Sequence, residues 1–469
     1  MKTPQNHLIH ALSANMMPDK TLIQGPYPLT YRTFWQGVEQ LATALNIEHG
    51  DRVAMQVEKS VEALQLYLAT VMAGGIIVPL NPAYTRAETL YFLEDSTPSI
   101  FVTPNPKGWP VPRARTLEAL VDAGDGRFVA AARGPEDLAA ILYTSGTTGR
   151  SKGAMLSHRA LASNAQTLQK AWEFTADDTL IHALPVFHTH GLFVATNVAL
   201  IAGASMEFLT MFSTDRVLEA MPQATALMGV PTFYTRLLKE ERLSVAATNM
   251  RLFVSGSAPL LARTHQEWRA QTGHTILERY GMTETNMNTS NPYNGERRAG
   301  TVGLPLPGVE LRIGDTKGEI GGIEVRGENL FSGYWKMPEK TAEELRPDGW
   351  FITGDLGQID ADGYVTIVGR GKDLIISGGF NIYPKEVEEV IDAIPQVLES
   401  AVIGLPDDDL GERVVAVVVL KSDSNKAALI ETASKKLARY KCPRHIHFVD
   451  ALPRNSMGKV QKNELRKQF

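Results

Sequence analysis

One short stretch of the sequence gathers the residue types that bind phosphate. Residues 143 to 153 read Tyr-Thr-Ser-Gly-Thr-Thr-Gly-Arg-Ser-Lys-Gly. Glycines let backbone N–H groups approach an anion closely, while hydroxyl groups and two cations add donors and positive charge. The stretch therefore predicts a phosphate-binding loop. Its candidate ATP-binding residues are Thr144, Ser145, Gly146, Thr147, Thr148, Gly149 and Lys152.

The stretch is not a Walker A loop, because that pattern places Gly-Lys-[Ser/Thr] together, whereas Lys152 lies three residues beyond Gly149. A flexible glycine-rich linker is the alternative interpretation. The apolar run at residues 138–143 is suited to a buried strand, and residues 158–172 have helical composition. We therefore expect a loop that connects a strand to a helix.

A pair of histidines follows the strand expected at residues 180–185. His188 and His190 would lie beyond its carboxyl end, where α/β sheets bind ligands. Metal ligation is disfavoured, because an i, i+2 pair without a nearby carboxylate or third ligand does not complete a metal site. Two ordinary structural histidines are the other alternative.

Arg236 is an isolated cation on the apolar helix expected at residues 231–239. An exposed position is as good an interpretation as a buried one, since one helical turn offers both faces. If Arg236 points inward, its planar guanidinium could hold a second carboxylate on a substrate.

The segment Glu278-Arg-Tyr-Gly-Met-Thr-Glu-Thr285 carries several groups that suit a nucleotide. Tyr280 offers an aromatic face for adenine and Thr283 a hydroxyl for the α-phosphate. Glu284 offers a hard oxygen ligand for Mg²⁺. A plain strand followed by a turn is the alternative interpretation.

Length and charge limit the class of protein. At 469 residues the chain is long enough for two or more domains. A net charge of −5 disfavours a generally basic, nucleic-acid-coating protein. Residues 433–469 nevertheless hold ten Lys and Arg against two acidic residues, which suits a small anionic ligand or a solvated helix face.

Cysteine usage and hydropathy point to the cytoplasm. Cys442 is the single cysteine, so an intramolecular disulfide or a cysteine metal cluster is excluded, as in a reducing compartment. The chain starts without an apolar signal core and has no apolar run near the roughly 18 residues that span a bilayer. We expect a cytoplasmic protein without a membrane segment.

Hydrophobic periodicity predicts alternating strands and helices with a mostly parallel sheet. Helices are expected at residues 30–45, 60–73, 85 onward, 158–172, 192–202, 215–220, 231–239 and 260–272, and strands at 53–57, 76–80, 99–103, 138–143, 180–185, 205–209, 225–230 and 252–255. Thr85 to Glu88 reads as a capping box. Residues 108–134 lack a period and are expected to be a surface excursion.

The last third of the chain changes character. Short strands punctuated by Gly and Pro between residues 300 and 369 predict a small β-barrel. After Arg370 a compact α+β pattern follows, with helices expected at 385–393 and 426–440 and strands at 400–403, 414–420 and 445–449. We place the domain boundary at residues 370–372.

These motifs together resemble the adenylate-forming superfamily of acyl-CoA synthetases, non-ribosomal adenylation domains and beetle luciferases. The resemblance runs from about Leu29 to Phe469 and looks closest to malonyl-CoA synthetases, through residues 58–64, 187–191, 230–236 and 278–293. It implies an α/β fold with a large N-terminal domain, residues 1–370, of doubly wound α/β subdomains plus the small β-barrel. A small, mobile α+β C-terminal domain, residues 371–469, would carry the catalytic lysine.

The resemblance also implies residue roles. The catalytic residues would be Lys459, Thr283, Glu284 (also the Mg²⁺ ligand) and His188, which would gate the thiol tunnel. ATP would further contact Ser257, Ala258, Pro259, Glu278, Arg279, Tyr280, Gly281 and Met282, with Asp355 and Arg370 on the ribose hydroxyls. The acyl substrate would contact His190, Arg236, Ser257, Arg279, Gly281 and Met282. Coenzyme A would pass Ser377, Gly378 and Gly379, and Lys372 would be the hinge.

The implied reaction consumes ATP, coenzyme A and malonate or methylmalonate, with Mg²⁺, and passes through an acyl-adenylate. Another short-chain acyl-CoA synthetase is the first alternative. An adenylation enzyme that loads a carrier protein is the second, and we expect no carrier segment after Phe469. A luciferase-like oxygenase and a non-catalytic nucleotide sensor complete the alternatives. No nucleic-acid or membrane partner is expected.

Overall fold

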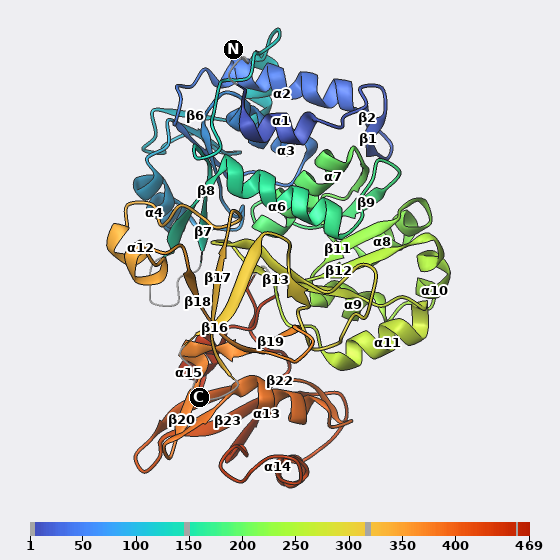
Figure 1. The fold of residues 1–469 in the computed structure, drawn as a ribbon, viewed down its shortest axis with the longest axis vertical. Helices are drawn as coiled ribbons and strands as arrows, with labels where there is room; N and C mark the ends of the chain where they lie inside the picture. The colour runs from blue at the N-terminus through green and yellow to red at the C-terminus, as the bar shows by residue number, and fades with distance from the viewer. Residues whose placement is uncertain (1–4, 145–150, 315–319, 456–457) are drawn as a thin grey trace.

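The computed structural model describes residues 5–144, 151–314, 320–455 and 458–469, and its strands form four sheets within those ranges (Figure 1). The first sheet has the strand order β6-β5-β3-β4-β7-β8, and the second has the order β15-β14-β13-β12-β11-β9-β10-β1-β2. Parallel pairs dominate both, which confirms the predicted α/β class.

The two large sheets are built from short strands. In the first sheet these are β3 (Arg52–Met55), β4 (Ile76–Pro79), β5 (Ile100–Val102), β6 (Arg113–Arg115), β7 (Leu138–Thr144) and β8 (Lys152–Ser157). In the second they are β1 (Thr21–Gln24), β2 (Leu29–Thr30), β9 (Thr179–His182), β10 (Ser205–Phe208), β11 (Ala226–Gly229), β12 (Leu252–Ser255), β13 (Leu277–Met282), β14 (Asn286–Ser290) and β15 (Leu304–Pro305).

Several helices of the large body begin at a residue whose side chain caps the helix. Thr30 caps α2 by accepting a hydrogen bond from the Thr33 N–H, and the predicted capping box of Thr85 and Glu88 is present in α4. The helices are α1 (His7–Ser13), α2 (Tyr31–Leu45), α3 (Val61–Met72), α4 (Arg86–Ser96), α5 (Leu117–Ala123), α6 (His158–Ala171), α7 (Thr196–Ala202), α8 (Thr214–Ala220), α9 (Pro231–Leu237), α10 (Leu243–Ala246), α11 (Ala262–Thr272) and α12 (Pro338–Glu344).

Two sequence predictions on the first sheet were wrong. Residues 108–134 hold β6 and α5, because Thr116 caps a helix that buries Leu117 and Leu120. The glycine-rich loop does not lead directly into α6, because β8 intervenes and pairs antiparallel with β7, Thr144 opposite Lys152. The loop therefore joins two antiparallel strands. Its residues Ser145, Gly146, Thr147, Thr148 and Gly149 lie outside the described residues.

The predicted small β-barrel corresponds to the third sheet, an antiparallel meander. Its strands are β16 (Val309–Gly314), β17 (Gly321–Gly327), β18 (Phe351–Ile359) and β19 (Val365–Arg370). The Val302 N–H donates to the Val365 carbonyl and the Val365 N–H to the Gly303 carbonyl, both at 2.8 Å. The chain just before β15 therefore lies along β19, so the third sheet adjoins the end of the second sheet.

The fourth sheet forms the small C-terminal body, drawn in orange and red at the bottom of Figure 1. Its strands are β20 (Ile375–Ser377), β21 (Phe380–Ile382), β22 (Val397–Asp407), β23 (Gly411–Leu420) and β24 (His445–Phe448), with helices α13 (Pro384–Asp392), α14 (Lys426–Ser434) and α15 (Lys462–Gln468). Helix α14 ends earlier than the predicted residue 440. The buried residues of the apolar clusters in the large body end at Val365, and those of the small body begin at Ile375. The domain boundary at residues 370–372 stays a prediction.

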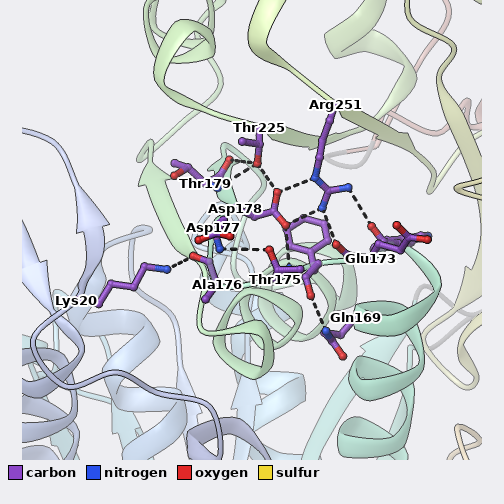
Figure 2. A network of polar contacts seen from close by, with 12 residues as sticks. Lys20, Gln169, Glu173, Thr175, Ala176, Asp177, Asp178, Thr179, Thr225 and Arg251 are labelled. Atoms are coloured by element: carbon purple, nitrogen blue, oxygen red, sulfur yellow. Dashed lines mark hydrogen bonds and ion pairs between the residues drawn. The ribbon is translucent and has the colours of Figure 1, made fainter.

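A polar network ties together the amino ends of three parallel strands of the second sheet (Figure 2). Arg251 donates from Nε and Nη2 to the two carboxylate oxygens of Asp178, both at 2.7 Å, and the Thr225 hydroxyl donates to the same carboxylate at 2.6 Å. These residues precede β12, β9 and β11, at the edge opposite the one where such sheets bind ligands. The network therefore stabilises the fold and is not part of the candidate site.

Every helix in the described part of the chain is too short or too polar to cross a membrane.

Candidate active site

The candidate site lies beyond the carboxyl ends of the parallel strands β9, β11, β12 and β13. The chain leaves β9 towards His188 and His190, leaves β12 towards Ser257, and leaves β13 towards Thr283 and Glu284. Parallel strands present their carboxyl ends at one edge, so segments far apart in the sequence meet there.

On the predicted nucleotide side, Tyr280, Asp355 and Arg370 lie together. The Tyr280 hydroxyl donates to Asp355 Oδ2 at 2.5 Å, and Arg370 Nε lies 2.7 Å from Asp355 Oδ1. Asp355 and Arg370 are directly opposite in the β18–β19 ladder. Burial and the Asp355 carboxylate raise the pKa of the Tyr280 hydroxyl, which keeps it a donor. Each carboxylate oxygen retains a further acceptor position for a ribose hydroxyl.

Glu284 is buried and connects to residues that the sequence motifs did not indicate. The Tyr334 hydroxyl lies 3.0 Å from Glu284 Oε1 and 2.6 Å from Glu344 Oε2. Lys152 Nζ lies 3.2 Å from Glu344 Oε1 and 4.0 Å from the Tyr334 ring centroid. Tyr334 precedes α12 and Glu344 is the last residue of this helix, whose sequence Pro-Glu-Lys-Thr-Ala-Glu-Glu is that of an ordinary surface helix. Lys152 contacts both residues because β8 runs antiparallel to β7, and this course of the chain was not predicted.

Lys459 reaches this site from the small body. Its neighbour Gly458 packs beside Thr232 of α9, and a Cβ built on Gly458 would lie 3.7 Å from that side chain. The Lys459 side chain is exposed to solvent. The surrounding protein and the Arg370 charge lower its pKa, while Asp355 and Glu284 oppose that shift. Burial and Lys459 together lower the pKa of His188 to about 3.

The predicted acyl side contains a buried cation. Arg279 is 4% exposed, and its Nε and Nη2 have no hydrogen-bond partner among the described residues. Burial lowers the pKa of Arg279 to about 9. His190 is buried beside it, with Nδ1 3.4 Å from the Ser257 hydroxyl and Nε2 without a partner in the part of the chain that the structure describes. Burial and the Arg279 charge lower the pKa of His190.

Two predicted site residues have contacts of their own. The Arg236 side chain is exposed on α9, with its guanidinium 5.9 Å from the Phe212 ring centroid, and its contact with the substrate stays a prediction. The Glu278 carboxylate is buried against α11, where it accepts from His265 Nε2 at 2.6 Å.

The turns after β12 and β13 have unusual backbone. Ser257 adopts a left-handed φ of +71°, which turns the chain through the half-buried Ala258 to the exposed Pro259. A Cβ on Gly281 would lie 1.9 Å from the Asn286 carbonyl oxygen, so glycine is required there. Met282 and Thr283 follow, half-buried, at the end of β13.

The predicted coenzyme A turn lies in the small body. Gly378 and Gly379 have φ of +57° and +79° and join β20 to β21, with Ser377 buried before them. This hairpin forms one edge of the fourth sheet, while the loop carrying Lys459 leads into α15, which packs on β22 at the opposite edge. Lys372 lies in the short helical turn Gly371–Asp373 between the two bodies.

The sequence matches one known family along most of its length. The AMP-binding enzyme model matches residues 11–335, and the model of the AMP-binding enzyme C-terminal domain matches residues 386–459. The chain therefore belongs to the AMP-binding enzyme family, and it is an AMP-forming acyl-CoA ligase. This confirms the resemblance to the adenylate-forming superfamily.

Individual relatives narrow the comparison. The malonate–CoA ligase of Arabidopsis thaliana is 37% identical over 475 residues, 90% of this chain and 78% of the relative. The mitochondrial malonate–CoA ligase of Mus musculus is 36% identical, over 89% of this chain and 82% of the relative. The crystal structure of ATP-bound MatB from Rhodopseudomonas palustris is 53% identical, with a TM-score of 0.95 over 99% of this chain and 98% of that chain. The apo structure of the same protein gives a TM-score of 0.85 over equal coverage, so the arrangement of this chain is closer to the ATP-bound one.

Proposed function

We propose that the protein ligates malonate to coenzyme A, forming malonyl-CoA, AMP and diphosphate through malonyl-AMP. The observation that carries this proposal is the buried Arg279 guanidinium with unpaired N–H groups beside His190 and Ser257. The relatives named malonate–CoA ligases support it. An indoleacetate–CoA ligase is 35% identical over 97% of the chain. Overall identity therefore does not identify the acid, and the choice of malonate rests on the residues of the site.

Malonate has two carboxylates, and one of them must face the α-phosphate to react. The other is free to bind a second cation, and Arg279 is the buried cation at this place. A buried, unpaired guanidinium is costly, and a carboxylate that accepts from both free N–H groups removes that cost. An acid with an apolar tail would leave the Arg279 donors unsatisfied.

The first half-reaction needs positioning and charge neutralisation. The malonate carboxylate attacks the α-phosphate, and diphosphate leaves. Lys459 would offset charge on the reacting oxygens, Thr283 would donate to the α-phosphate, and Lys152 would approach the leaving phosphates. Tyr280 would pack on adenine, while Asp355 and Arg370 hold the ribose hydroxyls.

The residues at Glu284 fit Mg²⁺. This ion takes hard oxygen ligands, keeps several waters, and is usually held by one or two carboxylates together with substrate phosphates. The buried Glu284 carboxylate, oriented by Tyr334, would hold it. When bound, Mg²⁺ neutralises phosphate charge.

The second half-reaction needs a different part of the small body. The coenzyme A thiol attacks malonyl-AMP and AMP leaves, with the turn at Gly378 and Gly379 lining the thiol path and His188 at its inner end. This turn and the loop carrying Lys459 lie at opposite edges of the fourth sheet, which supports the proposal that they face the site one after the other. A swing of residues 371–469 about Lys372 would exchange them.

A panel of acids tests the proposal. Diphosphate release with ATP should be fastest with malonate or methylmalonate, and both should exceed acetate and butyrate at least tenfold in kcat/KM, about 1.4 kcal/mol of discrimination. Equal rates with acetate would contradict the proposal, as would diphosphate release without transfer to coenzyme A.

A cytoplasmic location stays a prediction, since the Mus musculus relative is named mitochondrial.

A further inference from the structure

Lys59 is a buried lysine that none of the roles above uses. It lies between β3 of the first sheet and α3, yet its contacts are with β9 and β10 of the second sheet. Its Nζ lies 2.6 Å from the carbonyl oxygens of His182 and Leu209 and 3.0 Å from His182 Nδ1. The Phe208 ring centroid lies 4.4 Å away. A lysine this buried needs a partner for each of its protons.

The geometry gives the ammonium those partners. An ammonium has three N–H donors, and the two carbonyl oxygens and the imidazole nitrogen are three acceptors. His182 Nδ1 then accepts, so its proton must be on Nε2. Burial lowers the pKa of Lys59, and these hydrogen bonds favour the charged form against that shift.

The His182 tautomer acts on the π-helix η1 (His190–Ala195). His182 Nε2 lies 3.0 Å from the Gly191 carbonyl oxygen, which also accepts from the Thr196 hydroxyl at 3.0 Å. A Cβ on Gly191 would also lie 2.0 Å from the Pro185 carbonyl oxygen, so the backbone packs closely there. Gly191 is thus held by its carbonyl and by this close packing, and because it directly follows His190, a shift at Gly191 moves His190.

We propose that Lys59 is a positioning residue for the acyl site. Its ammonium fixes the Nε2–H tautomer of His182, which holds the Gly191 carbonyl and thereby keeps His190 beside Arg279 and Ser257. This inference rests on the proposed function in one respect, that His190 contacts the acid. The competing explanation, called the strut explanation below, is that Lys59 only links the two large sheets. It would then stabilise the fold without any effect on acid binding.

The chain offers a matched control for the strut explanation. Lys20 also donates to two carbonyl oxygens between elements, those of Ala176 and Gly203, and the Ala176 contact is visible in Figure 2. These contacts lie near the amino ends of β9 and β10, away from the acyl side. Lys20→Met removes a comparable strut without touching His190.

Steady-state kinetics separate the two explanations. Lys59→Met should raise the KM for the acid between about tenfold and a hundredfold, because a shift of about 1 Å in a positioning group has effects of that size. The KM for ATP should stay within about twofold. Lys20→Met should lower the thermal midpoint and leave both KM values unchanged. His182→Gln, whose amide N–H can take the place of Nε2–H, should lie closer to wild type than His182→Leu.

A double-mutant cycle tests the route through His190. In a His190→Ala background, Lys59→Met should produce no further rise in the KM for the acid. The cycle uses whichever acid gives the fastest diphosphate release, so it remains informative if malonate is not the substrate. Additive effects, or equal changes in the KM for ATP and the acid, would overturn the proposal.

The tautomer itself can be measured without any substrate. With ¹⁵N-labelled histidine, the signal that disappears in His182→Gln should show a protonated Nε2 and an unprotonated Nδ1 in the wild type. Lys59→Met should change that pattern. A protonated Nδ1 in the wild type would overturn the inference, whatever the acid turns out to be.

Discussion

The guanidinium of Arg279 occupies the space that a side chain at position 256 would fill: a Cβ on Gly256 would lie 2.4 Å from Arg279 Cζ. Gly256→Ala must therefore displace the guanidinium or the β12 turn. We expect the KM for malonate to rise by about tenfold or more, with a smaller effect on the KM for ATP.

Gly322→Ala is the matched control, because a Cβ there meets nothing within 4 Å. An unchanged malonate KM in folded Gly256→Ala would mean that Arg279 does not bind the acid.

Asp355 carries both contacts on the nucleotide side, one with Tyr280 and one with Arg370. Asp355→Asn removes the ion pair and should raise the KM for ATP by about tenfold, since a hydrogen bond to a charged group contributes about 1.5–3 kcal/mol. The ratio of kcat/KM values for malonate and acetate should stay the same. Asp360→Asn, which alters the Arg298 ion pair on the surface, should change neither value. A change in acid preference with Asp355→Asn would show that the nucleotide and acyl sides are not separate.

Arg263 of α11 holds the small body by donating to the carbonyls of Val397 and Leu398, at 3.2 and 2.8 Å. Both acceptors lie at the start of β22, near the side from which Lys459 enters. Arg263→Ala should slow diphosphate release severalfold while thioester formation from supplied malonyl-AMP changes less. Arg269→Ala on an exposed position of the same helix is the control. Equal slowing of both half-reactions would argue against a role in the adenylating arrangement.

The Asp178–Arg251 ion pair should contribute to stability rather than catalysis. Burial raises the pKa of Asp178, but hydrogen bonds from Arg251 and Thr225 outweigh it and leave the pKa below its ordinary 3.8. The stabilisation is then complete above that value and is lost as the pH falls through the lower folded-state pKa. Asp178→Asn should cost about 2–3 kcal/mol at pH 7, since Arg251 is partly exposed to screening solvent.

Urea unfolding at pH 7 and pH 3 measures this, and the difference between wild type and variant should shrink at pH 3. Asp177→Asn, at an exposed neighbouring position, is the control. A difference that grows on acidification would contradict the assigned direction of the shift.

The contiguous motifs could be predicted from the sequence, and the contacts between distant segments could not. Glu284 and Lys459 belong to short motifs whose order along the chain is distinctive. Lys59 and Tyr334 belong to no such motif. Lys59 contacts His182 and Leu209, and Tyr334 contacts Glu284, which all lie far away in the sequence. Strand β8 was not predicted because its first residues, Lys-Gly-Ala-Met, lack the β-branched residues typical of strands.

The burial of the two candidate arginines also could be predicted only in part from the sequence. Arg236 lies on a single helical turn with an exposed face, so its sequence context left both orientations open. Arg279 lies on β13, which pairs with β12 on one side and β14 on the other. A side chain on a strand inside a covered sheet is buried on either face, and the mostly apolar neighbouring strand β12 is the signal that favours Arg279 over Arg236 as the buried cation.

Arg279→Met shows whether Arg279 makes this ligase select a dicarboxylate. Diphosphate release should be measured with malonate and with butyrate, alongside ATP binding by calorimetry. We predict that the variant binds ATP as the wild type does, loses at least a hundredfold in kcat/KM for malonate, and gains relative activity on butyrate, since a hydrogen-bonded charge pair discriminates by about 2–5 kcal/mol. Equal loss on both acids, or a retained preference for malonate, would contradict the account.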